Sequence, residues 1–220
     1  MLPTIPCTDF LHLVLFECEA CPDPVAAYMI RQAAITFAEV SKTWRHTGSM
    51  AIASNNETIV APDHTAIHTI EEATLNGQKL TPVAFLASEP TQLTGLSPTG
   101  AAAEITQVEP DKVQLNPFQT GTLRFSLTLK PTRARLLGTF PGDPLRDAHD
   151  VLPAYMFSQH AQTIARGALA KILMLPNQPF TNPQTAMGYN AAFMAACSDA
   201  QNDARMGQQR APRRNRIDWF

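Results

Sequence analysis

The fold of this chain is decided by one stretch near its C-terminus, DVLPAYMFSQHAQTIARGALAKILML, residues 150–175. Its apolar residues recur every three or four positions, the spacing of one face of an α-helix. The alanines around Gly167 keep the predicted helix thin, so that another helix can approach it closely. Pro176 disfavours helical geometry at Leu175 and therefore ends the helix.

A second helix is expected after a proline-rich elbow. In LPNQPFTNP, residues 175–183, three prolines restrict the backbone, and Asn182 with Pro183 has the pattern of an N-cap followed by the first helical position. The apolar positions that follow continue to about Met206, and Gly207 is a natural helix stop. We therefore predict a helical hairpin over residues 151–206.

A third long helix is predicted near the N-terminus. Asp23 and Pro24 form a cap and a first helical position, and an apolar stripe runs from Val25 through Tyr28 to Val40, with Trp44 extending it. We interpret this stripe as buried core.

Between the helical segments, residues 47–131 change from helical to alternating periodicity. Asn76-Gly77 between two strand candidates is a strong hairpin signal, and Glu109-Pro110-Asp111 separates another pair. Residues 122–130 alternate apolar and polar side chains, which is typical of a strand with one buried and one solvated face. The segment therefore predicts an antiparallel sheet.

Together these patterns predict an α+β fold in which a helical bundle carries an inserted antiparallel β lobe and an extended C-terminal tail. The predicted parts are an N-terminal helical part over 1–46, the β lobe over 47–135, the helical hairpin over 136–207 and a basic tail over 208–220. Because the sheet interrupts the helices, the first and last elements are expected to pack together.

Composition and charge bound the possible functions. The chain has 220 residues, 45% of them hydrophobic, and a net charge of −2. Five arginines and one aspartate give the last sixteen residues a formal charge of +4, which leaves −6 for the rest. This distribution argues against a general nucleic-acid binder and for a tail with its own partner. We expect no signal peptide and no membrane span, because no stretch approaches the roughly 20 apolar residues that a span needs.

Several residue groups raise the question of a metal or catalytic site. Cys18 and Cys21, with Cys7 nearby, invite a zinc or redox interpretation, but a structural zinc site needs four ligands, so reduced thiols are favoured. His64 and His68, with their acidic neighbours, lack a third ligand on the same strand face.

Catalytic patterns are equally weak. His149 beside Asp150, and His160 near Ser158, lack the nucleophile elbow of a hydrolase, and no glycine-rich phosphate loop is present. We therefore expect a protein that is not an enzyme, with no metal site and no cofactor.

The C-terminal tail is the sharpest functional candidate. It is polar and arginine-rich, so it is not expected to fold alone, yet it ends in two aromatic residues. Tryptophan and arginine supply the largest contact energies in interfaces, which favours a docking peptide over a frayed, solubilising terminus. The docking residues are predicted to be Arg210, Arg213, Arg214, Arg216, Ile217, Trp219 and Phe220.

Motifs along nearly the whole chain resemble one family. In the hairpin they are Leu152-Pro153, Ile164-Ala165, Arg166 to Lys171, Leu173, Leu175-Pro176, Pro179-Phe180 and Asn182-Pro183. Upstream they are Cys21-Pro22-Asp23-Pro24, Phe37, Trp44-Arg45, Leu75 to Pro82 and Leu129-Lys130-Pro131-Thr132-Arg133. In this order they resemble the head-to-tail adaptor, or connector, proteins of podovirus-type tailed phages. The segment 86–103 departs from the family pattern, because it lacks the expected aromatic Gly-x-Pro-x-x-Tyr type of sequence.

The resemblance implies a structural virion protein at the head-tail junction, assembled in the host cytoplasm. Such a protein forms a dodecameric homo-oligomeric ring that binds the portal protein and a tail tube or nozzle protein, and genomic DNA passes non-specifically through its lumen during ejection. The tail is then expected to insert into the portal and the β lobe to face the phage tail. The residues expected to serve subunit packing are Tyr28, Phe37, Trp44, Ile164, Leu169 and Phe193.

Three alternatives remain open. A tail nozzle, a tube terminator or a head-completion protein would have a neighbouring structural role. A nucleic-acid-binding module that uses the arginine-rich tail would bind with an affinity that falls steeply with salt. An enzyme with an unrecognised site would reveal itself by a bound metal or substrate.

Overall fold

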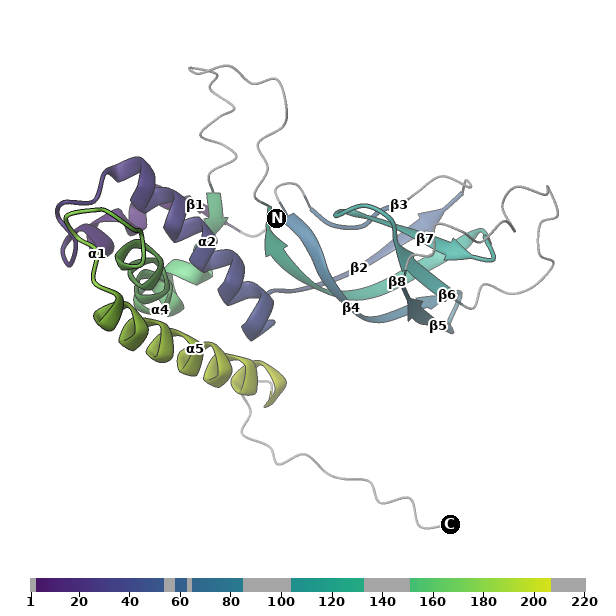
Figure 1. Cartoon of the computed structure of the whole chain (residues 1–220). Coiled ribbons are helices and arrows are strands. Elements are labelled where there is room, and N and C mark those ends of the chain that lie inside the picture. Colours follow the sequence, from purple (N-terminus) through teal and green to yellow (C-terminus); the bar gives the residue numbers. More distant parts are fainter. Residues whose placement is uncertain (1–2, 54–57, 63–64, 85–103, 133–150, 207–220) are drawn as a thin grey trace, which may run out of the picture. The chain divides into compact units, whose positions relative to one another are not determined.

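The computed structural model describes residues 3–53, 58–62, 65–84, 104–132 and 151–206 (Figure 1). The chain forms two compact units, a helical unit made of Met1–Thr43 and Arg133–Phe220 and a sheet unit made of Trp44–Thr132. The predicted α+β fold class is confirmed. The sheet unit begins at Trp44 and ends at Thr132, whereas the sequence placed the inserted lobe at 47–135.

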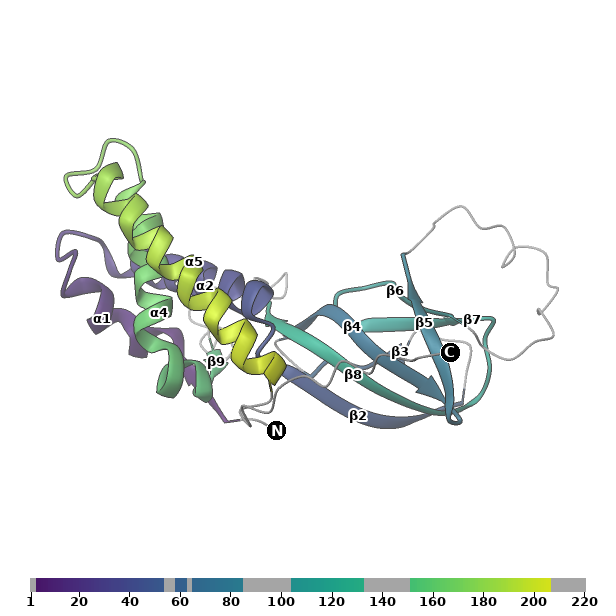
Figure 2. The ribbon, with the colours of Figure 1, turned by 90° about the horizontal axis from the view of Figure 1, so that it is seen from below.

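The helical unit contains three long helices and a small N-terminal cluster. Its elements are β1 (Thr4–Pro6), η1 (Cys7–Phe10), α1 (Leu11–Leu15), α2 (Asp23–Ser41), β9 (Val151–Pro153), α4 (Ala154–Leu173) and α5 (Pro183–Met206). Strands β1 and β9 pair antiparallel. Helix α4 packs against both α2 and α5 (Figure 2). None of the helices in the described ranges combines the length and apolar character needed to cross a membrane.

The core of the helical unit lies where α2, α4 and α5 meet. Many of its side chains are small, because alanines and Gly167 allow close helix approach. Its buried residues include Ala26, Ile30, Ala33, Phe37, Ile164, Ala165, Ala168, Ile172, Phe193 and Cys197.

Helix α2 differs from the sequence expectation in its end and its buried face. It ends at Ser41, and Lys42 adopts a left-handed conformation with φ 51°, so Trp44 does not extend the helix. The backbone carbonyl of Trp44 instead accepts a hydrogen bond from the amide of Leu129 in the sheet unit, at 2.8 Å. Tyr28 was predicted to be core, but its side chain is 57% exposed. The face that packs inward is set instead by Ala26 and Ile30, which lie two positions before and after Tyr28 and are fully buried.

The sheet unit contains one curled, seven-stranded sheet of order β2-β8-β4-β5-β6-β7-β3. The strands are β2 (Arg45–Ile52), β3 (Thr58–Ile59), β4 (Thr65–Leu75), β5 (Gln78–Val83), β6 (Glu104–Gln107), β7 (Lys112–Asn116) and β8 (Gly121–Pro131). The sheet is mixed, because β5 and β6 pair parallel. The prediction of a purely antiparallel lobe was therefore wrong at this one pair. A parallel pair needs a crossover of a dozen or more residues, and residues 84–103 supply that length.

Hairpin predictions within the sheet unit agree with the structure. Asn76 and Gly77 both have positive φ, 52° and 86°, as a type I′ turn between β4 and β5 requires. Strands β6 and β7 pair antiparallel around the turn at Glu109–Asp111. Alternate residues of β8, from Leu123 to Leu129, are buried. Strand β2 was not predicted, because RHTGSMAI shows no clear apolar alternation.

Candidate interaction surfaces

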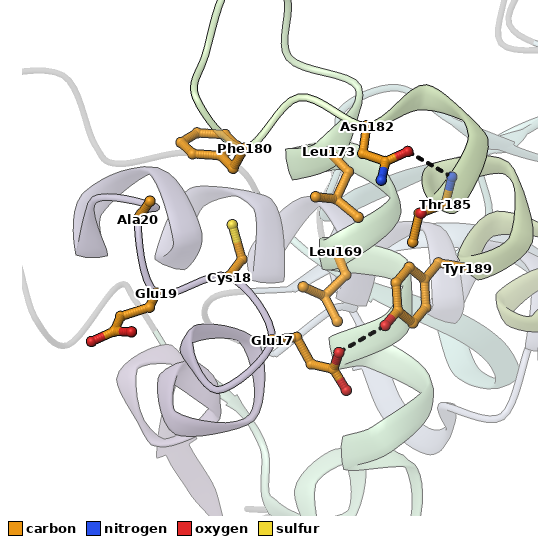
Figure 3. A pocket seen from close by; sticks show the side chains of 10 residues that line it. All are labelled: Glu17, Cys18, Glu19, Ala20, Leu169, Leu173, Phe180, Asn182, Thr185 and Tyr189. Carbon is orange, nitrogen blue, oxygen red and sulfur yellow. Dashed lines mark hydrogen bonds between the residues drawn. The ribbon is translucent and has the colours of Figure 1, made fainter.

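A groove in the helical unit is the first candidate surface (Figure 3). It has a volume of about 340 Å³ and is formed by the turn between α1 and α2, two leucines of α4, the elbow and the first turns of α5. We call it the elbow groove. Its lining residues are Glu17, Cys18, Glu19, Ala20, Leu169, Leu173, Phe180, Asn182, Thr185 and Tyr189.

The elbow groove combines an apolar floor with an acidic rim. Leu169 and Leu173 are buried residues of α4, and Phe180 of the elbow is half-buried. Glu17 and Glu19 are exposed on the side of the α1–α2 turn. This combination suits an extended ligand that carries aromatic and cationic groups.

A hydrogen bond joins two walls of the elbow groove. The hydroxyl of Tyr189 donates to a carboxylate oxygen of Glu17 at 2.9 Å. This bond, together with partial burial, raises the pKa of Tyr189, and the nearby positive charge of Arg166 opposes the rise. Because one ionised carboxylate offers about four acceptor sites, Glu17 keeps capacity for a further donor.

The elbow that carries Phe180 is held by its own hydrogen bonds. The hydroxyl of Thr181 donates to the carbonyl of Leu175 at 2.5 Å and accepts from the amide of Gln178 at 3.0 Å. The side-chain oxygen of Asn182 accepts from the amide of Thr185 at 3.1 Å, so the predicted N-cap of α5 is confirmed. These contacts fix the wall of the groove before any ligand arrives.

The second candidate surface is an exposed side of α5. Met187 and Met194 are 63% and 39% exposed, and Ala191, Ala195 and Ser198 on the same side are also exposed. We call these five residues the outer face of α5. From Pro183 to Ser198 the helix carries no charged residue. Over residues 183–198 both sides of α5 are therefore uncharged, although one side is packed and the other is exposed.

Further apolar side chains of the helical unit are exposed. Phe16, at the end of α1, is 90% exposed, Tyr28 is 57% exposed and Met174 is 56% exposed. Single exposed apolar residues are normal in soluble proteins. Here they occur together with the uncharged outer face of α5, so they enlarge the exposed apolar surface of the helical unit.

The residues predicted for subunit packing have different environments. Phe37, Ile164, Leu169 and Phe193 are at most 3% exposed and lie within the helical unit. Trp44 is 8% exposed and belongs to the sheet unit. Only Tyr28 of the six offers a large exposed surface to another molecule. The predicted docking residues Arg210, Arg213, Arg214, Arg216, Ile217, Trp219 and Phe220 lie outside the described residues.

The cysteines are reduced and buried. Burial raises the pKa of the Cys18 thiol and of the Cys21 thiol, and the amide of Cys21 donates to the carbonyl of Cys18 at 3.1 Å. Burial also raises the pKa of Cys197 to about 11. Within the described parts of the chain, no three His, Cys, Asp or Glu side chains come together in a way that could hold a metal ion.

The histidine patterns lie only partly within the described residues. His64, His149 and Asp150 lie outside the described residues. The ring of His160 packs on Phe37 with centroids 4.6 Å apart, and Ser158 donates to the carbonyl of Tyr155. Glu71, three residues after His68 in β4, forms an ion pair with Arg45 at 3.0 Å.

Neither a scan against models of protein families nor a search of curated proteins finds a match to this chain.

The exposed, uncharged face of α5 was not predicted from the sequence, although the sequence contains the pattern that indicates it. The absence of charge over residues 183–198 is visible in the sequence, but such a run is also typical of a fully buried helix. The elbow groove could not be anticipated, because its walls come from segments more than 130 residues apart.

Proposed function

We propose that this chain is a structural virion protein, a head-to-tail adaptor that forms a ring between the portal and the tail of a phage. The sequence motifs that resemble the adaptor family support this proposal, as does a fold with a helical unit interrupted by a sheet unit. The ring belongs to the head-tail junction and is assembled in the host cytoplasm.

The observation that carries the proposal is the uncharged outer face of α5. Interface cores are depleted of charged residues and enriched in methionine, and monomeric soluble proteins rarely expose large contiguous apolar patches. Met187 and Met194, with Ala191, Ala195 and Ser198 on the same side, give an uncharged patch with two exposed methionines along three turns of helix. We infer that this face is covered by another protein subunit in the working assembly.

A ring requires a heterologous interface, in which one face of a subunit meets a different face of the next. The outer face of α5 would supply one side. The exposed aromatic side chains of Phe16 and Tyr28 are suitable anchors for the other, since aromatic residues dominate binding energy in interfaces.

The remaining partners follow from the same proposal. The arginine-rich tail would bind the portal protein, and the sheet unit would meet the tail tube or nozzle protein. Several tails on one ring would act together, so that individually weak contacts give one tight joint. Genomic DNA would pass through the lumen without being read.

The test is co-sedimentation of the purified chain with its cognate portal, comparing the full-length protein with a chain that ends at Gly207. A stoichiometric ring on the portal with the full-length protein, and none with the truncated chain, is the expected result. A full-length protein that stays unbound with every portal preparation contradicts the adaptor role.

A second candidate rests on the tail alone. Four arginines within residues 210–216 would give a nucleic-acid-binding module whose affinity falls steeply with salt. This function would be favoured by a chain that does not bind the portal but retards the electrophoretic mobility of DNA at low salt. A nozzle, terminator or head-completion role predicts a different co-sedimenting partner.

A further inference from the structure

The elbow groove is complementary in character to one segment of this same chain. Its floor is apolar, through Leu169, Leu173 and Phe180, and its rim is acidic, through Glu17 and Glu19. The last eight residues of the chain, RRNRIDWF, contain three arginines and end in two aromatic residues. We propose that the elbow groove holds the chain's own C-terminal segment, Arg213–Phe220, while the tail is not engaged by a partner.

Charge complementarity supports this occupant. Glu17 has acceptor capacity beyond its bond to Tyr189, and Glu19 is exposed two residues further along the same turn, so two carboxylates can pair with tail arginines. Arg166 is the cation whose charge acts on Tyr189. Asp218 is the only acidic side chain among the last eight residues, and it offers Arg166 a partner.

The apolar parts also match. A volume of about 340 Å³ is within the range of roughly 300–1,000 Å³ that is usual for pockets that bind small ligands. That space accepts one large aromatic side chain, and Trp219 is the largest in the tail. Packing of Trp219 on Leu173 and Phe180 would remove three apolar surfaces from water at once.

The tail is long enough to reach the groove. Tyr189, in the groove, and Met206, at the end of α5, are separated along the helix by about 26 Å at 1.5 Å per residue. The thirteen residues from Met206 to Trp219 span up to about 43 Å when extended. The segment can therefore fold back beside α5 and enter the groove of its own chain.

A tail held in this way acts as a latch. Attachment to the same chain gives an effective concentration in the millimolar range, so even a weak groove contact keeps the tail occupied. A partner must compete with the groove for the same arginines and aromatic residues. The latch does not depend on the partner being a portal, and it goes beyond the proposed adaptor function.

The experiment uses the full-length chain and its two tryptophans, Trp44 and Trp219. In a Trp44→Phe chain, Trp219 is the only tryptophan, and its emission and its quenching by acrylamide report its burial. We expect blue-shifted, protected emission that stays constant over a wide dilution series, because the contact is within one chain. If Trp44→Phe does not fold, 5-fluorotryptophan resonances of the otherwise unchanged chain, assigned with Trp219→Phe, give the same information.

Matched variants locate the contact. Phe180→Ala removes an aromatic anchor and Glu19→Lys reverses a rim charge, and each should lower the docked fraction from about nine-tenths to about half. Glu72→Lys places the same new charge on an exposed position of the sheet unit and should leave the protection of Trp219 unchanged.

Two results would overturn the latch. One is acrylamide quenching of Trp219 that is equally strong in the parent chain and in the Phe180→Ala chain. The other is protection that disappears on dilution, which would mean exchange of tails between copies. Portal binding is measured separately. If Trp219 is protected but the chain does not bind the portal, the adaptor function is contradicted and the latch is supported.

Discussion

Gly167 of α4 lies directly against the ring of Phe193 of α5. A Cβ atom added at Gly167 would lie 2.8 Å from two carbons of that ring and 3.1 Å from the Cβ of Ala33 on α2. All three long helices therefore come within side-chain contact at this glycine. The hydrogen atom of Gly167 is what allows the fully packed Phe193, 2% exposed, to occupy its place.

Gly167→Ala should therefore destabilise the chain by about 1–2 kcal/mol, because overpacking costs about 1–3 kcal/mol and the gain in helix propensity offsets at most about 1 kcal/mol. Gly188→Ala is the matched control on α5, since nothing lies within 4 Å of its added Cβ. That variant should be more stable than the parent by up to about 1 kcal/mol. Urea denaturation followed by circular dichroism measures both, and a stabilised Gly167→Ala would contradict the close approach.

The turn at Asn76-Gly77 should be sensitive to backbone conformation alone. Gly77 has φ 86° and no atom within 4 Å of an added Cβ, so a substitution meets strain and no clash. Gly77→Val should cost about 1–2 kcal/mol, whereas Gly77→Asn should cost less, because asparagine tolerates positive φ. The difference is measured by thermal unfolding of the two variants; equal losses would point to a cause other than φ.

The N-cap of α5 should contribute measurably to stability. Asn182→Ala removes the acceptor for the amide of Thr185 and should cost about 1 kcal/mol. Asn182→Asp keeps an acceptor and places a negative charge at the positive end of the helix dipole, so it should be close to the parent in stability. Chemical denaturation separates the two, and an unchanged Asn182→Ala would show that the cap is replaced by water.

His160 should make stability depend on pH below neutrality. Burial lowers the pKa of His160 from its ordinary value of 6.5, so the unfolded chain binds the proton more tightly than the folded chain. The contribution of His160 to the free energy of unfolding is then fully present above pH 6.5. It falls as the pH drops through 6.5 and stops falling below the pKa of His160 in the folded chain. His160→Gln removes this contribution, although His46, whose pKa burial also lowers, remains in both chains. Urea midpoints at several pH values measure the difference, and parallel pH profiles would contradict the prediction.

The outer face of α5 should be needed for assembly and dispensable for folding. Met187→Glu with Met194→Glu places two charges on exposed positions, so the stability of the monomer should change by less than about 0.5 kcal/mol for each, while ring formation on the portal is lost. Gln162→Glu adds a charge at an exposed position of α4 and serves as the control. Analytical ultracentrifugation with portal present reads the outcome, and an intact ring in the double variant would place the interface elsewhere.

Local chemistry made much of the fold predictable. Asn182-Pro183 caps a helix and Asn76-Gly77 closes a hairpin because the conformations that these residues favour are set by their own side chains and immediate neighbours. The end of α2 was misplaced for the complementary reason. Trp44 is large and apolar, and its position within the helical period was consistent with both a final helix turn and a residue that begins another unit.

By itself, the sequence determined the α+β class, the hairpin of long helices, the two tight turns of the sheet and the contrast between an acidic body and a basic, aromatic tail. Each of these depends on periodicity, backbone preference or charge over short stretches. Only the tertiary structure decided that Tyr28 lies outside the core, that β5 and β6 run parallel, and that Glu17 meets Tyr189 to form a groove. Those features depend on which segments pack together, and a single residue's local preferences carry no information about which other segment it will meet.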